Sequence, residues 1–267
     1  MPIREITLAA GDAQLHLDLD AGGRATRLAI GDLDVLAQPD PHSLYHWGSF
    51  VMAPWAGRIR EGRFSFDGRR YRLPINFGSH AIHGTVADRP WRYVEHTRDT
   101  AVIDCRLDDR WPWNGFVRHV INLAGASAHF RIEVHAEDQP FPAAAGWHPW
   151  FSRRLARGGT LELDVTADAI LKRDDSHIPT GERAPIPPQP WDDCFDKVGW
   201  PVTLTWPDAL QLDVSGDTRY GVIFTEPEDA VCVEPQTGPP DALNLEPVLV
   251  TPDDPLTAEM NWTWRRA

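Results

Sequence analysis

Polar and apolar residues alternate with a period of two along much of this chain, and this alternation restricts the fold more than any other feature. It is clearest in residues 130–134, 161–165, 202–206 and 210–214. Each segment places apolar side chains on one face and polar side chains on the other, which is typical of a β-strand with one buried face. The sequence therefore predicts a protein built from many strands.

Two pairs of alternating segments are predicted to be β-hairpins. Residues 6–10 reach a Gly-Asp turn and alternate back through 15–19, and residues 64–66 reach an Asp-Gly turn and return through 71–73. Short turns rich in Gly and Asp between two alternating runs are typical of hairpins.

Helices are expected to contribute little to the fold. No amphipathic segment of ten or more residues is apparent, and 24 prolines and 20 glycines interrupt the chain. Many short strands between turns predict an all-β fold, a sandwich or barrel. A β-sandwich of this size commonly forms one domain, so residues 1–267 are expected to be a single domain. The proline-rich residues 184–190 are either a linker or an extended surface connection, and the strand-like segments on both sides favour the connection.

Charge and targeting signals exclude several kinds of partner. The net charge of −13 argues against nucleic acid and against an anionic membrane surface, which both require clustered Lys and Arg. The N-terminus lacks the apolar region of a signal peptide, and no apolar stretch approaches the length of a membrane span, so a cytoplasmic location is expected. The three cysteines are scattered and predict neither a disulfide framework nor a zinc site. The oligomeric state is left open.

Two segments of the first third of the chain concentrate polar groups among Gly, Pro and aromatic residues. Residues 53–62 contain Arg58, whose guanidinium offers five fixed donors suited to hydroxyl groups. Residues 80–84 contain His80 and His83 followed by Gly, and no third ligand at a diagnostic spacing supports a metal site there.

Two later segments carry a histidine and a carboxylate. In residues 146–151, His148 is followed by Pro and flanked by tryptophans, and histidine titrates near neutrality as a proton shuttle must. In residues 231–244, Glu234 ends an apolar strand and precedes a proline-rich loop, and a carboxylate in an apolar stretch needs a partner or a function.

Four tryptophans adjoin these segments and are therefore candidates for stacking on a sugar ring, although large aromatic residues more often fill the core. They are Trp55, Trp147, Trp150 and Trp191.

Taken together, these motifs resemble those of the aldose 1-epimerase family, the galactose mutarotases. His83 matches the family's Leu/Ile-His-Gly motif, and His148 matches Gly-x-His-Pro-aromatic-Phe. Glu234 matches the glutamate before Pro-Gln, and Asp192 matches a sugar-binding aspartate, with Asp193 as the alternative. The motifs occur in the family's order through most of the chain.

The chain departs from the family pattern in two places. Gly57 precedes Arg58 where the longer galactose mutarotases carry Asn, and Trp150 stands where Tyr is more usual. These features are similar to those of the shorter, bacterial-type branch and leave the identity of the sugar open.

The resemblance implies the large antiparallel β-sandwich, or supersandwich, of galactose mutarotase-like proteins. It also implies interconversion of the α and β anomers of a free aldose without metal or redox cofactor. Glu234 would be the base at the C1 hydroxyl, His148 the acid at the ring oxygen, and His83 would stabilise developing charge.

The resemblance assigns further residues to substrate binding. Arg58 and Asp192 would hold ring hydroxyls and Trp150 would stack on the sugar, and we group His80 with them. A phosphorylated sugar is an alternative substrate if four arginines converge; these are Arg58, Arg60, Arg89 and Arg92.

Three other functions remain open at this point. A non-catalytic carbohydrate-binding sandwich would use the same aromatic and polar loops without needing a Glu–His pair. A glycosidase would use Asp192 and Glu234 as its two carboxylates, and His148 would then have no role. A cupin-type isomerase would bind a metal through His80 and His83.

Overall fold

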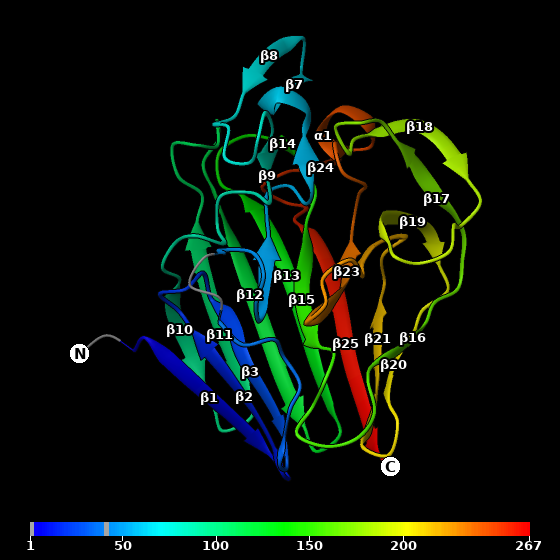
Figure 1. Cartoon of the computed structure of the whole chain (residues 1–267). Coiled ribbons are helices and arrows are strands. Elements are labelled where there is room, and N and C mark those ends of the chain that lie inside the picture. Colours follow the sequence, from blue (N-terminus) through cyan, green and yellow to red (C-terminus); the bar gives the residue numbers. More distant parts are fainter. Residues whose placement is uncertain (1–2, 40–42) are drawn as a thin grey trace.

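Two large antiparallel sheets hold most of the chain (Figure 1). The structure, a computed structural model, describes residues 3–39 and 43–267. Within these ranges the helices are limited to the four-residue α1 (Ala242–Leu245) and the 3-10 turn η1 (Arg60–Gly62). The all-β prediction is therefore confirmed.

The larger sheet has eleven strands in the described part of the chain. In spatial order they are β1 (Glu5–Ala10), β2 (Ala13–Asp18), β3 (Arg24–Ile30), β5 (Ser49–Met52), β15 (Gly146–Ser152), β23 (Ala230–Gln236), β22 (Tyr220–Phe224), β19 (Asp192–Val198), β17 (Ala167–Arg173) and β18 (Pro179–Ala184), with β4 (Leu33–Asp34) paired to β3.

The smaller sheet has eight strands among the described residues. In spatial order they are β10 (Arg92–His96), β11 (Thr100–Arg106), β12 (Gly115–Ala124), β13 (Ser127–Ala136), β25 (Leu256–Arg266), β21 (Leu210–Gly216), β20 (Val202–Trp206) and β16 (Glu162–Asp164). Short two-stranded pairs lie at one end of the molecule: β14 (Phe141–Ala143) with β24 (Val248–Val250), β6 (Arg58–Ile59) with β9 (Ala81–Ile82), and β7 (Arg63–Phe66) with β8 (Arg69–Arg72).

The local predictions agree with this topology. The two predicted hairpins are the antiparallel pairs β1–β2 and β7–β8. Residues 184–190 connect β18 to β19, and both strands flank β17 in the same sheet. The proline-rich segment is thus an extended connection within one sheet rather than a linker.

The core lies between the two sheets and explains the alternation seen in the sequence. Phe151 of β15 packs edge-on against Trp262 of β25, with ring centroids 5.4 Å apart. Trp147, also on β15, donates its indole N–H to Nε2 of His119 on β12 at 3.1 Å. Side chains of the larger sheet that point the other way do not enter this core, and several of them form the site described below.

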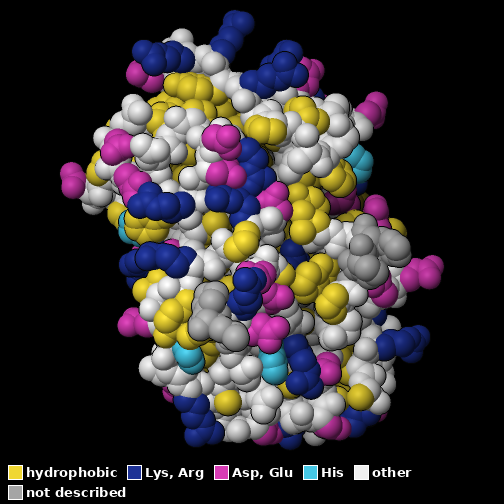
Figure 2. Space-filling view, turned by 90° about the vertical axis from the view of Figure 1, so that its left-hand side faces the viewer, with side chains coloured by type: hydrophobic (Ala, Val, Ile, Leu, Met, Phe, Trp, Pro, Cys, Tyr) yellow, Lys and Arg dark blue, Asp and Glu magenta, His cyan; other side chains and the backbone are white. Residues whose placement is uncertain are grey.

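The face seen in Figure 2 carries basic and acidic side chains side by side rather than a field of one sign. The cysteines Cys105, Cys194 and Cys232 are buried free thiols, as expected without a disulfide framework. Among the described residues, no helix combines the length and apolar character that a membrane span needs.

Candidate active site

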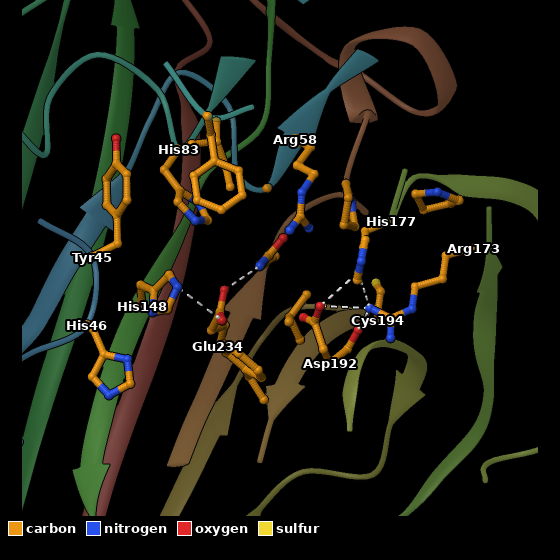
Figure 3. A pocket seen from close by; sticks show the side chains of 18 of the residues that line it. Tyr45, His46, Arg58, His83, His148, Arg173, His177, Asp192, Cys194 and Glu234 are labelled. Atoms are coloured by element: carbon orange, nitrogen blue, oxygen red, sulfur yellow. Dashed lines mark hydrogen bonds and ion pairs between the residues drawn. The ribbon is translucent and has the colours of Figure 1, made fainter. Parts of the chain in front are cut away.

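A cavity of about 260 Å³ lies on the larger sheet, with central strands of that sheet forming its floor (Figure 3). Its volume is close to the lower end of the range for pockets that hold small molecules. The floor comes from β15, β23, β22 and β19, and the walls come from the loops around residues 43–46, 57–58, 77–83 and 177–179.

The period of two places the polar residues of the floor. On β23, Val231 and Val233 belong to the core between the sheets, while Glu234 and Gln236 line the cavity. All seven residues of β23 are buried, because one face meets the core and the other lies beneath the cavity. Glu234 therefore lies in an apolar strand without lying in the apolar core.

Glu234 and His148 face each other at the centre of the floor. Oε1 of Glu234 lies 3.4 Å from Nε2 of His148, and the two side chains are 3% and 6% exposed. The second carboxylate oxygen, Oε2, accepts a hydrogen bond of 2.9 Å from Nε2 of Gln236. The dashed lines in Figure 3 mark these contacts.

Burial shifts the protonation of both groups. Burial raises the pKa of Glu234 to about 8, an effect that hydrogen bonds from Cys232 and Gln236 oppose. Burial also holds the pKa of His148 well below its usual value, and the neighbouring His83 adds to that decrease. Each group is therefore held toward its neutral form.

His83 borders the pair from the wall of the cavity. Its ring centroid lies 5.0 Å from that of His148, with the rings edge to face. Burial, together with the positive Arg58, lowers the pKa of His83 to about 3, so the ring is neutral at physiological pH. Its Nδ1 is buried and has no hydrogen-bond partner among the described residues.

The backbone around His83 requires the glycine that follows it. His83 has a positive φ of 58°, and its N–H donates to the carbonyl of Gly57 at 3.1 Å. Gly84 has a φ of 75°, and a Cβ there would lie 1.9 Å from the carbonyl oxygen of Ala53. Only glycine fits such an approach, which accounts physically for the His-Gly motif.

Arg58 enters the cavity from β6 and points toward Glu234 (Figure 3). Among the described residues its guanidinium donates no hydrogen bond, and the Phe77 ring lies 5.3 Å away. Gly57, the departure from the family pattern, has a φ of 65° and lies against Pro240. Asn and Gly are the residues that most readily adopt this left-handed backbone, but a Cβ at position 57 would lie 3.0 Å from Pro240, so glycine suits this chain.

Asp192 on β19 forms the opposite side of the cavity. Its Oδ2 accepts a hydrogen bond of 2.7 Å from Nη1 of Arg173 and lies 3.0 Å from Nδ1 of His177. Asp193, the alternative raised by the sequence, does not line the cavity. Asp192 is thus the member of the pair that a ligand in the cavity can reach.

The structure brings most of the predicted site residues to this one cavity. Its lining includes Glu234, His148, His83, Arg58, Asp192 and Trp150. His80 is not among the lining residues; its Nδ1 accepts the N–H of Glu61 at 3.1 Å. The indole of Trp150 is stacked against His46, with centroids 4.2 Å apart.

Other candidates from the sequence lie elsewhere. Trp55, Trp147 and Trp191 belong to the core cluster. The four arginines considered for a phosphate site do not converge, because Arg60 pairs with Asp174, and Arg89 and Arg92 lie at a different surface hollow beside β11.

The sequence did not reveal several residues of the cavity. Gln236 lies two residues after Glu234, so the period of two predicts its position on the same face. Arg173 and His177 belong to the β17–β18 hairpin, whereas Tyr45 and His46 belong to a loop. Tertiary folding brings both segments to the cavity, and no local sequence pattern in either segment indicates this.

One group of donor atoms in the site could hold a metal ion. Ligand atoms of His148, Cys232 and Glu234 lie within 4.8 Å of one another. His80 and His83, which are considered only as the metal ligands of an alternative cupin-type isomerase, are not part of this group. The same three side chains also contact one another without a metal: Nε2 of His148 lies 3.4 Å from Oε1 of Glu234, and its Nδ1 lies 3.0 Å from Sγ of Cys232.

Comparison of its sequence with known families assigns the chain to one of them. Residues 6–242 match the family described as aldose 1-epimerase, and the chain belongs to that family. The protein YihR of Escherichia coli K12, which is uncharacterised, is 25% identical over 265 residues, covering 90% of this chain and 85% of its own. Pig galactose mutarotase is 28% identical over 177 residues, covering 62% of this chain and 50% of the enzyme.

Solved structures share the fold at low sequence identity. A putative aldose 1-epimerase from Escherichia coli K12 aligns with a TM-score of 0.84 at 19% identity, covering 98% of this chain and 99% of its own. Galactose 1-epimerase from Lactobacillus acidophilus aligns with a TM-score of 0.82 at 17% identity, covering 98% and 94%. These alignments confirm the galactose mutarotase-like sandwich.

Proposed function

We propose that this protein interconverts the α and β anomers of a free aldose. The observation that carries the proposal is the direct contact of 3.4 Å between Glu234 and His148 on the floor of a cavity of about 260 Å³. Opening a sugar ring requires one group to take the C1 hydroxyl proton while another delivers a proton to the ring oxygen. These two oxygens are bonded to the same carbon, so the base and the acid must be close together.

In this proposal, the proton shared by the pair first moves from Glu234 to Nε2 of His148. Glu234 then takes the proton from the C1 hydroxyl while His148 gives its Nε2 proton to the ring oxygen, and the C1–ring oxygen bond breaks. The open aldehyde rotates about C1–C2. Closure on the other face returns both protons, with Glu234 as the acid and His148 as the base. The pair therefore ends the cycle in its starting state.

The remaining groups of the cavity suit recognition of an uncharged, hydroxylated ring. Arg58 presents unengaged N–H donors, and Asp192 presents a carboxylate that is held in place by Arg173. His83 is neutral, and its ring lies edge to face with that of His148. In the proposal, it hydrogen-bonds the reacting oxygens. Because Arg173 is already paired with Asp192, the described residues of the cavity offer no cluster of free cations for a phosphate.

Exchange between anomers, followed by proton NMR across a panel of free and phosphorylated aldoses, tests the proposal. Wild-type protein should accelerate the exchange of at least one free aldose, and Glu234→Gln should lower turnover by about 10² or more while leaving sugar binding nearly unchanged. Glu259→Gln, which changes an exposed carboxylate on β25, is the matched control. Sugar binding without exchange in the wild type would instead indicate a carbohydrate-binding protein.

A further inference from the structure

Cys232 lies directly behind the Glu234–His148 pair. Its Sγ is 3.0 Å from Nδ1 of His148, and both side chains are buried. The residue is fully inaccessible to solvent and does not line the cavity. It therefore contacts the acid–base pair without being able to touch a ligand.

The two nitrogens of His148 have different partners. Nε2 faces Glu234 and the cavity, whereas Nδ1 faces the thiol of Cys232. A neutral imidazole carries one proton, and the hydrogen bond made by one nitrogen decides which nitrogen carries it. If Nδ1 holds the proton and donates it to Sγ, Nε2 is free to accept a proton and release it again. The opposite tautomer has no lone pair at Nε2 to accept one.

A thiol differs from the carboxylate or carbonyl that commonly supports a histidine. Sulfur is a weak and uncharged acceptor, so it can orient the ring without stabilising a positive charge on it. Such a partner is consistent with the lowered pKa of His148. Burial keeps the thiol itself protonated, because it holds the pKa of Cys232 well above its usual value.

Cys232 also interacts with the other member of the pair. Its hydrogen bonding to the carboxylate opposes the rise in the pKa of Glu234. The register of β23 produces this arrangement, because Cys232 and Glu234 are two residues apart and point to the same side of the sheet. Trp150, which pairs with Cys232 across the strands, packs with it and closes the space around the sulfur.

We propose that Cys232 is a positioning residue that holds His148 as its Nδ1–H tautomer and thereby reserves Nε2 for proton transfer. The inference rests on the proposed function. The sulfur accepts the Nδ1–H throughout the cycle, while the proton that moves is always on the Nε2 side. Cys232 neither gains nor loses a proton in the reaction.

Two substitutions at Cys232 separate hydrogen bonding from packing. Cys232→Ser retains a hydrogen-bonding group, whereas Cys232→Val fills the space without one. Cys105→Val, at a buried thiol of β11 outside the cavity, is the matched control. Loss of the contact should lower kcat by about tenfold in Cys232→Val and leave KM within about twofold, as expected for one hydrogen bond that acts on the chemical step. Cys232→Ser should recover most of kcat.

The tautomer of His148 is read directly from ¹⁵N NMR of the imidazole, with the signals assigned by comparison with His148→Asn. Wild type and Cys232→Ser should show the Nδ1–H form, and Cys232→Val should shift toward Nε2–H. An Nε2–H form in the wild type, or an unchanged tautomer and kcat in Cys232→Val, would overturn the inference. This measurement needs no substrate, so it remains informative if every aldose fails to exchange and the proposed function itself is rejected.

Discussion

Oε1 of Glu234 and Nε2 of His148 lie 3.4 Å apart, on side chains that are only 3% and 6% exposed. Burial disfavours charge on each group, so the pair is expected to hold one shared proton over a wide range of pH. Ring opening transfers one proton to the pair and one away from it. The number of protons on the pair therefore stays constant through the proposed reaction, although their positions change.

The pH dependence of kcat/KM follows from this shared proton. The pKa of Glu234 is raised to about 8, so the pair keeps its proton until the pH rises through that value. The pKa of His148 is well below 6.5, so a second proton binds only at lower pH. We expect kcat/KM to stay high at pH 6 and to fall above about pH 8. An unperturbed pair would instead be active only between about pH 4.3 and 6.5.

The free energy of unfolding should also depend on pH, because the pKa of Glu234 differs between the folded and unfolded protein. The pKa of Glu234 in the folded protein, about 8, lies above the ordinary value of 4.5 that applies when it is unfolded. Stability from the neutral carboxyl is thus fully present below pH 4.5 and lost as the pH rises through 8. Urea titrations should show Glu234→Gln gaining about 2–5 kcal/mol over wild type between pH 4.5 and 9. An equal gain in Glu259→Gln would exclude the buried carboxyl as the cause.

The unengaged guanidinium of Arg58 is expected to act in binding. Arg58→Lys keeps the charge but replaces a rigid fork of five donors with three donors on a flexible stem. KM should rise by about tenfold, and kcat should change less, since one or two hydrogen bonds to the sugar are lost. Arg70→Lys on the exposed strand β8 provides the control. A fall in kcat alone would move Arg58 from recognition to the chemical step.

Gly84 and Gly68 form a matched pair for testing the turn beside His83. Their φ values are 75° and 71°, but a Cβ at Gly84 would lie 1.9 Å from the oxygen of Ala53, whereas nothing lies within 4 Å of one at Gly68. Gly68→Ala should cost about 1 kcal/mol of unfolding free energy, from backbone conformation alone. Gly84→Ala should cost about 3 kcal/mol or more and reduce activity, because His83 is displaced. Equal losses in denaturant titrations would show that the close approach relaxes easily.

The sequence predicted the fold well because the fold depends on a local pattern. Alternation and Asp-Gly turns appear in neighbouring residues, and they identified β7–β8 and four of the eight described strands of the smaller sheet, β13, β16, β20 and β21. The site was predicted through motifs that lie far apart in the chain. The structure places Glu234, His148 and Arg58 around one cavity, which the alternation alone does not indicate.

The cavity residues that could not be predicted from the sequence are brought to the cavity by the tertiary structure. Arg173 and His177 reach the cavity because the β17–β18 hairpin folds beside β19, and neither residue belongs to a recognisable motif. His80 shows the opposite case. It lies three residues from His83 in a promising segment, but its ring hydrogen-bonds the backbone of Glu61 instead of facing the cavity.

The strand β23 supplies core residues from one face and cavity residues from the other. A shift of its register by one residue would exchange Val233 with Glu234 and damage folding and chemistry together. Wall residues such as His46 and His177 line the cavity from loops and do not belong to the core cluster. Selection for a different ligand can therefore change such wall residues one at a time, while β23 and β15, which carry Glu234 and His148, remain invariant.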